Sequence, residues 1–455
     1  MKADRSAVRI VGAGPTGALL AILLQRGGCA SVELYESRPD PRGRPAESGR
    51  SINLALADRG IHALKLAGVF PDLKEALLPM RGRMIHRAGG GTSLQPYGQR
   101  PNELIYSISR HRLNQALLEV AARQPGVKVH FEHRFEAADF DQGTALIRDL
   151  RHDRLISVPM QPLLAADGAG SLMRRRMSSL HLIEAHETDL AHGYKELTIP
   201  ADAAGRHTMA SDALHIWPRG DYMLIALPNE DGTFTATLFL AKHGEVSFEN
   251  LTGAAAIEGF FERNFPDARE LMPDCIAEFE DHPVGFLGTV SADRWHYGSM
   301  AALIGDSAHA IVPFHGQGMN CCFEDCVEFD ACMGRHSSWE SVFAEFGALR
   351  KPNTDAIRLM TLDNYLEMRE RVADPKFQLQ QALSLELERR FPQYFIPRYS
   401  MVMFHHEIPY RIAYERGAVQ AQLLAELTAG AVSTLDDVDF ERAEHEIRAR
   451  LAPLS

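Results

Sequence analysis

The sequence predicts an α/β protein with an inserted β-sheet and a mainly helical C-terminal region. Three observations predict this class: a short apolar strand with a glycine-rich turn and an apolar helix near the start, strand-rich residues 193–240, and helical periodicity after Phe323. We expect three parts, which are a discontinuous domain at 1–180 and 280–335, a sheet domain at 181–279 and a helical region at 336–455. Part of 60–110 should contribute to the substrate pocket.

Composition and charge exclude several classes of partner. The 455 residues have a formal net charge of −12, and 45% of them are hydrophobic, which is ample for a sizeable core. Because no lysine- or arginine-rich run occurs, neither nucleic acid nor an anionic membrane is expected as a partner. Apolar runs are short and the first residues lack a signal-peptide pattern, so we expect a cytoplasmic protein. The six cysteines lack metal-site spacing, which favours small core residues and no metal.

The first βαβ unit is predicted at residues 8–36. A strand, Val8–Val11, precedes Gly-Ala-Gly-Pro-Thr-Gly at Gly12–Gly17, and a second strand ends at Glu36, 19 residues after Gly17. Glycines allow a tight turn and close approach of the backbone to a pyrophosphate, and the acid can accept hydrogen bonds from ribose hydroxyls. The spacing predicts a Rossmann-like dinucleotide-binding domain. The alternative is a glycine turn in another kind of βαβ unit.

Two later stretches repeat this theme of a buried strand that ends at a carboxylate and a glycine. The first ends at Asp167-Gly168, and the second ends at Gly305-Asp306. A carboxylate at a strand end suits a hydrogen bond to a sugar-like hydroxyl. Gly316–Asn320 then begins a helix, whose free N–H groups could hold the negative charge of a reduced flavin. By itself this segment could equally be an ordinary βα turn.

Other elements follow from periodicity and from turn residues. Arg83 lies in a strand expected at 81–86, where an arginine more often faces solvent than a ligand. Arg110 begins a helix that Ser109 can cap, and it could meet a phosphate or merely solvent. The helical C-terminal region should break at Pro352, Pro375 and Pro392 and contain a β-like segment at 395–402. Further expected elements are a loop from 49 into an apolar run, a helix at 58–67, and strands at 104–108, 127–131, 154–158, 214–217, 222–227 and 233–240.

Taken together, the three cofactor-like stretches resemble the FAD-dependent aromatic hydroxylases related to para-hydroxybenzoate hydroxylase. The resemblance spans nearly the whole chain, except that Ala88–Ser93 has no counterpart. Eukaryotic members end in a membrane-anchoring helix, but residues 405–455 are polar, so membrane attachment is not implied. The matching blocks are GRSINLALADRG (Gly49–Gly60), RGRMIH (Arg81–His86), LQPYG (Leu94–Gly98), HGYKEL (His192–Leu197), LHIWPRGDYMLIALPN (Leu214–Asn229), IVPFHGQGMN (Ile311–Asn320), NYLEMR (Asn364–Arg369) and FIPRYSMVMF (Phe395–Phe404).

The resemblance implies FAD as the cofactor and NADPH as a co-substrate. No second glycine fingerprint lies between a strand and a helix, so NADPH is expected to bind without a Rossmann domain of its own. The residues implied to hold FAD are Gly12, Gly14, Thr16, Gly17, Glu36, Ser37, Arg38, Ala55, Arg110, Phe135, Asp306, Gly318, Met319 and Asn320.

The resemblance also implies that Arg83, Tyr97, Asn364 and Tyr399 hold the amino-acid end of L-kynurenine, which reverses the solvent-facing interpretation of Arg83. A forked cation, two phenols and an amide suit such a ligand. The implied reaction gives 3-hydroxykynurenine through a flavin C4a-hydroperoxide. No catalytic side chain is expected because the cofactor carries the chemistry. His309 and His315 are expected to be structural rather than basic catalysts.

Three alternatives remain at this point. One is a hydroxylase of another aromatic amino acid or a related arene. Another is a flavin-dependent halogenase, although such enzymes carry a Trp-x-Trp motif and the three tryptophans here are far apart. The third is a non-catalytic FAD-binding protein. The oligomeric state does not follow from the sequence.

Overall fold

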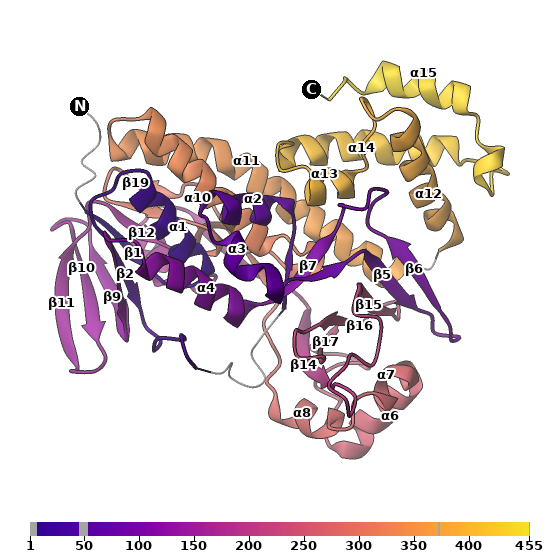
Figure 1. Ribbon diagram of the computed structural model, residues 1–455, viewed down its shortest axis with the longest axis horizontal. Helices are drawn as coiled ribbons and strands as arrows, with labels where there is room; N and C mark the ends of the chain where they lie inside the picture. Colours follow the sequence, from indigo (N-terminus) through magenta and orange to yellow (C-terminus); the bar gives the residue numbers. More distant parts are fainter. Residues whose placement is uncertain (1–6, 45–52, 372–373, 455) are drawn as a thin grey trace. The chain divides into compact units, whose positions relative to one another are not determined.

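The computed structural model describes residues 7–44, 53–371 and 374–454 (Figure 1). The loop expected at 49–52 therefore lies outside the described residues. The chain forms two compact units: a first unit of 1–77, 108–190 and 288–358, and a second unit of 78–107, 191–287 and 359–455. The predicted α/β class is confirmed. The three-part functional division stays a prediction.

The first unit is organised around a mostly parallel sheet in the order β19-β20-β12-β1-β2-β8. Only β19 in this sheet is antiparallel to its neighbour, and β1, β12 and β20 are almost entirely buried, as expected for parallel strands. Helix α1 (Pro15–Arg26) links β1 to β2 and packs against α4 and α10. The bounds are β1 Val8–Val11, β2 Val32–Glu36, β8 Val127–Phe131, β12 Leu163–Ala165, β19 His296–Tyr297, β20 Ala301–Leu303, α4 Arg110–Ala122 and α10 Gly318–Arg335.

Smaller elements complete the first unit. An antiparallel sheet contains β9, β10 and β11, of which only the last was predicted, and β13 pairs with β18. Ser109 occupies the predicted N-cap position of α4, but its side chain does not form the capping hydrogen bond. The bounds are β3 Asn53–Leu56, α2 Asp58–Leu66, α3 Phe70–Leu73, η1 Lys74–Ala76, β9 His133–Asp139, β10 Thr144–Asp149, β11 Arg154–Pro159, α5 Leu172–Ser179, β13 Ala185–Asp189, β18 Gly288–Ala292, α9 Asp306–His309 and η2 Pro313–His315.

The second unit contains a six-stranded sheet in the order β14-β17-β16-β15-β5-β6. Its aromatic core includes Trp217, Phe234, Phe261 and Phe265, which are fully buried between strands and helices α6 to α8. Strand β5 pairs in parallel with β15 and therefore fixes Arg83 opposite Leu214. The bounds are β4 Leu78–Met80, β5 Gly82–His86, β6 Thr92–Pro96, β7 Ile105–Ser109, β14 His192–Ile199, β15 Ala213–Pro218, β16 Met223–Pro228, β17 Phe234–Ala241, α6 Ala254–Asn264, α7 Pro266–Glu270 and α8 Cys275–Asp281.

The C-terminal region is helical, and two predictions about it were wrong. Pro352 does not break a helix but lies inside α11, where buried side chains such as Phe346 and Ile357 outweigh its lost backbone hydrogen bond. The β-like segment 395–402 instead contains the start of α13, because tertiary packing overrides the strand propensity of its aromatic and branched residues. The bounds are α11 Trp339–Leu366, η3 Glu367–Arg371, α12 Pro375–Arg390, α13 Arg398–Phe404, α14 Tyr410–Leu427, η4 Leu435–Asp437 and α15 Phe440–Arg450.

The other two prolines mark helix ends as predicted, since Pro375 begins α12 and Pro392 lies two residues after its last residue, Arg390. Helices α12, α14 and α15 share a core that includes Leu383, Leu387 and Phe395. Over the ranges that the structure describes, no helix is both long enough and apolar enough to cross a membrane.

Candidate functional site

The glycine turn after β1 has the geometry of a dinucleotide cradle. Gly12 has φ +95°, and a Cβ there would lie 2.4 Å from the Ala166 carbonyl oxygen. A Cβ on Gly17 would lie 2.0 Å from the Gly12 carbonyl oxygen, so the fold itself requires both glycines. Gly14, the N-cap of α1, has no heavy atom within 4 Å of its ideal Cβ position. The open space at Gly14 fits a pyrophosphate at a helix N-terminus.

Glu36, at the end of β2, presents a buried carboxylate to this turn. It accepts hydrogen bonds from the backbone N–H of Ala13 (3.0 Å) and of Arg38 (2.9 Å), and from Nε of Arg38 (2.9 Å). Burial raises the pKa of Glu36, but the hydrogen bonds and charge of Arg38 outweigh burial, so its pKa lies below the ordinary value. The Ser37 hydroxyl lies 3.4 Å from the same carboxylate. An ionised carboxylate beside the cradle can accept ribose hydroxyls.

A second loop brings Thr16 together with Gly305 and Asp306. Gly305 has φ +66°, and its ideal Cβ would lie 3.0 Å from the Thr16 side chain and 3.1 Å from Sγ of Cys322. The Cys322 thiol approaches Asp306 Oδ1 at 3.4 Å. The Asp306 carboxylate is therefore placed at the end of the central sheet beside the start of α1, as required for a ribitol contact.

Asn320 connects the start of α10 to strand β3. Its amide nitrogen donates to the carbonyl oxygens of Ala55 (2.8 Å) and Gly316 (2.9 Å), and its amide oxygen accepts from the N–H of Ala57 (2.9 Å). Asn320 is fully buried. These bonds place Ala55 beside the helix start that carries Gly318 and Met319. Asn320 thus positions the backbone around the predicted flavin edge, while its direct contact with the cofactor stays a prediction.

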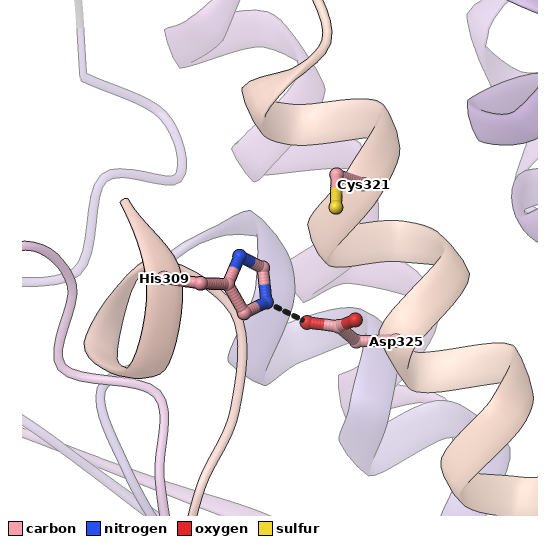
Figure 2. A group of neighbouring side chains, drawn as sticks. All are labelled: His309, Cys321 and Asp325. Atoms are coloured by element: carbon pink, nitrogen blue, oxygen red, sulfur yellow. Dashed lines mark hydrogen bonds and ion pairs between the residues drawn. The ribbon is translucent and has the colours of Figure 1, made fainter. Parts of the chain in front are cut away.

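A buried charge cluster lies around Asp325, and Figure 2 shows Asp325 with its partner His309 and the nearby Cys321. Asp325 Oδ2 is 2.5 Å from His309 Nε2 and accepts the N–H of Gly305 at 3.1 Å, and Oδ1 accepts from Arg350 Nε at 2.7 Å. Nη1 of Arg350 also lies 2.6 Å from Glu324. Burial raises the pKa of Asp325, but the charges of His309 and Arg350 outweigh burial and leave its pKa below the ordinary value.

His309, Cys321 and Asp325 have their ligand atoms within 4.8 Å of one another, as a metal site would require. Both carboxylate oxygens of Asp325 already accept strong donors, and a guanidinium nitrogen of Arg350 lies 3.5 Å from Sγ of Cys321. Burial also raises the pKa of the Cys321 thiol well above its ordinary value. A metal ion at this position would lie against the positive charge of Arg350. The group is therefore an ion-pair network and not a metal site. The hydrogen bond between His309 and Asp325 agrees with the structural role expected for His309, which stays a prediction.

Two predicted cofactor residues rest on the resemblance alone. Phe135 is a core residue of β9 paired with Ile147, and Arg110 is exposed at the first position of α4. Arg38 has a 71% exposed side chain that pairs with Glu36. His315 is buried, as a structural residue would be.

In the second unit, the four predicted substrate residues lie together. Arg83 is only 7% exposed, so the solvent-facing interpretation was wrong. Its guanidinium lies 4.8 Å from the ring centroid of Tyr399 and 6.0 Å from that of Tyr97, and those two rings stack at 5.7 Å. Nη2 of Arg83 is 3.5 Å from the amide oxygen of Asn364. Residues from β5, from the loop after β6, from α11 and from α13 therefore form one polar aromatic cluster.

The cluster also contains an acid that the sequence analysis missed. Glu367 Oε1 lies 3.5 Å from Nη1 of Arg83. Its signal was available, because Glu367 follows Asn364 by three residues inside the matching block NYLEMR. A carboxylate beside a guanidinium can accept from an α-ammonium group while the guanidinium binds an α-carboxylate.

Electrostatics keep Arg83 charged and both phenols neutral. Burial lowers the pKa of Arg83, but Tyr399 and Glu367 outweigh burial and leave its pKa above the ordinary value. Burial raises the pKa of Tyr97 and of Tyr399. The buried Nε of Arg83 has no hydrogen-bond partner among the described residues, although the guanidinium also interacts with the phenols of Tyr97 and Tyr399. Its contacts with Asn364 and Glu367 are both long. A buried cation in this state fits an additional anion.

Comparison with known proteins agrees with this geometry. A family model described as an FAD binding domain matches residues 5–331. The chain is 49% identical to a kynurenine 3-monooxygenase of Stenotrophomonas maltophilia over 99% of this chain and 98% of that protein. It is 44% identical to the enzyme of that name from Myxococcus xanthus, over 99% and 97%.

Solved structures support the fold. They include 2-methyl-3-hydroxypyridine-5-carboxylic acid oxygenase (TM-score 0.64, 19% identity, covering 84% of this chain and 97% of that one). Pseudomonas aeruginosa PqsL, in complex with 2-aminobenzoylacetate, has a TM-score of 0.65 at 19% identity, covering 80% and 97%.

Proposed function

Because the chain belongs to the kynurenine 3-monooxygenase family and contains an FAD binding domain, we propose that it hydroxylates L-kynurenine at ring carbon 3, with NADPH and O₂ as co-substrates. It is an FAD-dependent aromatic monooxygenase. When bound, FAD supplies the activation of O₂, which no amino-acid side chain can provide. The single observation that supports an amino-acid substrate is the buried, incompletely paired guanidinium of Arg83 among Tyr97, Asn364 and Tyr399.

The first unit holds FAD in this proposal. The turn Gly12–Gly17 receives the pyrophosphate, Glu36 accepts ribose hydroxyls, and Asp306 accepts hydroxyls of the ribitol. Gly14→Val tests the pyrophosphate contact. The open space around Gly14 should let the variant fold, but its side chain would fill the cradle, so the purified protein should lack the flavin absorbance of the wild type. A folded variant with a full flavin spectrum would contradict the assignment.

The second unit holds the amino-acid end of the substrate. Arg83 donates two parallel hydrogen bonds to the α-carboxylate, and the neutral phenols of Tyr97 and Tyr399 donate to the same group or order its surroundings. The oxygens of Asn364 and Glu367 accept from the α-ammonium. These residues orient the arene and exclude water. We assign no side chain as a general acid or base.

Product analysis tests the proposal directly. FAD-loaded protein incubated with NADPH, O₂ and L-kynurenine should yield a ring-hydroxylated product, and L-kynurenine should accelerate flavin reduction in stopped flow. Kynurenamine, which lacks the carboxylate, should bind far more weakly. An equal reduction rate with and without L-kynurenine, and no hydroxylated product, would instead favour a non-hydroxylating FAD-binding protein. If only another arene gave a hydroxylated product, L-kynurenine would not be the substrate.

We also propose a cytoplasmic location. All six cysteines are buried thiols, which suits a reducing compartment.

A further inference from the structure

The loop that carries Tyr97 continues into a segment with one well-defined shape. Strand β6 ends at Pro96, and the N–H of Tyr97 donates to the Arg81 carbonyl oxygen at 3.0 Å. Beyond Tyr97, the carboxylate of Glu103 holds the backbone in place, because it accepts hydrogen bonds from the N–H of Gln99 (2.6 Å) and of Arg100 (2.9 Å). Gly98 packs so closely on this acid that a Cβ would lie 2.2 Å from Glu103 Oε2. The backbone after Tyr97 is therefore held by a buried carboxylate.

The same segment is bound to helix α12. The side-chain amide of Gln99 donates to the carbonyl oxygen of Leu385 (2.8 Å) and to Oε2 of Glu388 (3.0 Å). Nη1 of Arg100 lies 3.3 Å from Glu388 Oε1 and 2.5 Å from Glu103 Oε1, so one guanidinium bridges two acids. Glu388 is only 1% exposed. A carboxylate buried to this extent is costly unless it is paired, so the contact with Gln99 and Arg100 is specific.

Helix α12 is itself fixed in the C-terminal core. Its Leu383 and Leu387 are fully buried in a cluster with Phe395 and with residues of α14 and α15. The chain then continues to α13, whose Tyr399 stacks on the ring of Tyr97. The C-terminal region therefore reaches Tyr97 by two routes, directly through Tyr399 and indirectly through the loop contacts of Glu388.

We propose that Glu388 is a positioning residue for substrate binding: with Gln99 and Arg100, it fixes the loop that places the Tyr97 hydroxyl beside Arg83. The proposal rests on the proposed function, because it assumes that Tyr97 contacts the substrate. It gives helix α12 a role in substrate affinity although none of the four proposed substrate residues lies on this helix. Flavin binding, which belongs to the first unit, should not depend on Glu388.

Two variants and one matched control test the role of Glu388. Glu388→Gln keeps the side-chain shape but removes the charge shared with Arg100. Gln99→Ala removes both side-chain hydrogen bonds to α12 from an exposed position, so its folding is not at risk. The control is Glu386→Gln, two residues earlier on the same helix, whose carboxylate pairs with Arg389 (2.7 Å) and Arg390 (2.6 Å) of that helix.

Each test variant should weaken L-kynurenine binding by about five- to tenfold, the size expected for losing one or two hydrogen bonds. The loss should appear in Kd and KM, with FAD content unchanged and kcat changed by less than about twofold, because the ring position and the flavin site are intact. Glu386→Gln should bind L-kynurenine as the wild type does. Equal Kd values for Glu388→Gln, Gln99→Ala and the control would overturn the proposal.

A double-mutant cycle separates positioning of Tyr97 from a general structural role. In a Tyr97→Phe background, Gln99→Ala and Glu388→Gln should each change Kd by less than about twofold, because the hydroxyl that they position is already gone. The same five- to tenfold loss in that background would show that they do not act through Tyr97. If the wild type itself fails to bind L-kynurenine, the proposed function fails as well. Wild-type binding with unchanged variants contradicts the role of Glu388 alone.

Discussion

Arg350 in the first unit and Arg83 in the second are both buried cations, but their surroundings differ. Arg350 lies 2.7 Å from Asp325 and 2.6 Å from Glu324, and Asp325 accepts further bonds from His309 and Gly305. Arg83 has its acid, Glu367, at 3.5 Å, and its Nε lacks a hydrogen-bond partner among the described residues. The first cation is fully paired within the protein, and the second is not.

This difference separates a structural charge from a binding charge. Burial by itself does not indicate function, since Arg350 is 3% exposed and Arg83 is 7% exposed. A fully paired buried cation has no donor left for a ligand, so removing its partner damages the fold. An incompletely paired one costs stability until an anion arrives, so removing it damages binding instead. Substitutions around Arg350 should therefore lower stability, and substitutions around Arg83 should lower substrate affinity.

Asp325→Asn should have the largest effect, and that effect should fall on stability. The variant replaces the charged acceptor of both Arg350 and His309 by a neutral amide and leaves Arg350 paired with Glu324. Weakening a buried ion-pair network in this way costs up to about 3–5 kcal/mol. Equilibrium denaturation should show this loss in the free energy of unfolding. FAD content should fall as well, because Asp325 holds the N–H of Gly305 beside Asp306. Glu328→Gln, on the same helix, serves as the control and should change stability by less than about 0.5 kcal/mol.

The pH dependence of stability shows whether Asp325 is ionised in the folded protein. The folded-state pKa of Asp325 lies below its ordinary value, so the ionised form stabilises the fold. This contribution is present above the unfolded-state pKa of about 3.9 and is lost as pH falls through the folded-state pKa. The stability difference between wild type and Asp325→Asn should therefore be largest near neutral pH and shrink in acid. A difference that does not change with pH would contradict an ionised Asp325.

Arg83→Met should reduce substrate binding and leave stability nearly unchanged. Removing the cation should weaken L-kynurenine binding by about 30- to 5,000-fold, corresponding to about 2–5 kcal/mol for a buried carboxylate without its partner. Stability and FAD content should stay close to those of the wild type, since no short ion pair is broken. Titration with L-kynurenine and with kynurenamine measures the discrimination between them. A variant that keeps the wild-type preference for L-kynurenine would show that Arg83 does not bind the carboxylate.

The sequence predicted the strands and turns of the first unit better than it predicted the contacts of Arg83 in the second unit. The strands around Gly12, Glu36 and Asp306 follow from local periodicity and glycine spacing, which act over a few residues. Strand periodicity predicted that Arg83 faces solvent. This was wrong because the burial of Arg83 depends on Tyr399 and Asn364, which lie far along the chain. Only the family resemblance corrected that assignment.

Other elements were missed for related reasons. The salt bridge between Asp325 and Arg350 joins two helices and has no local signature in the sequence. Residues 395–402 had strand-like composition, and the helix that begins at Arg398 forms because packing in the C-terminal core determines its conformation. Glu367 was missed within a matching block because a block does not show which of its side chains face the ligand.

Tyr97→Phe and Tyr399→Phe should have the smallest effects, because each removes a hydroxyl and keeps a ring. The rings can still stack, and the Arg83 guanidinium can still lie over Tyr399. Losing one hydrogen bond from a phenol to the substrate should weaken L-kynurenine binding by about 1–2 kcal/mol, or roughly 5- to 30-fold. The matched control in the first unit is Tyr35→Phe, whose hydroxyl donates to Glu33 at 3.1 Å and whose loss should leave L-kynurenine affinity unchanged. Fluorescence titration of the four proteins measures all these affinities. If either substrate-site variant lost as much L-kynurenine affinity as Arg83→Met, a phenol rather than Arg83 would be the main partner of the substrate carboxylate. The contrast between the two arginines would then no longer explain binding.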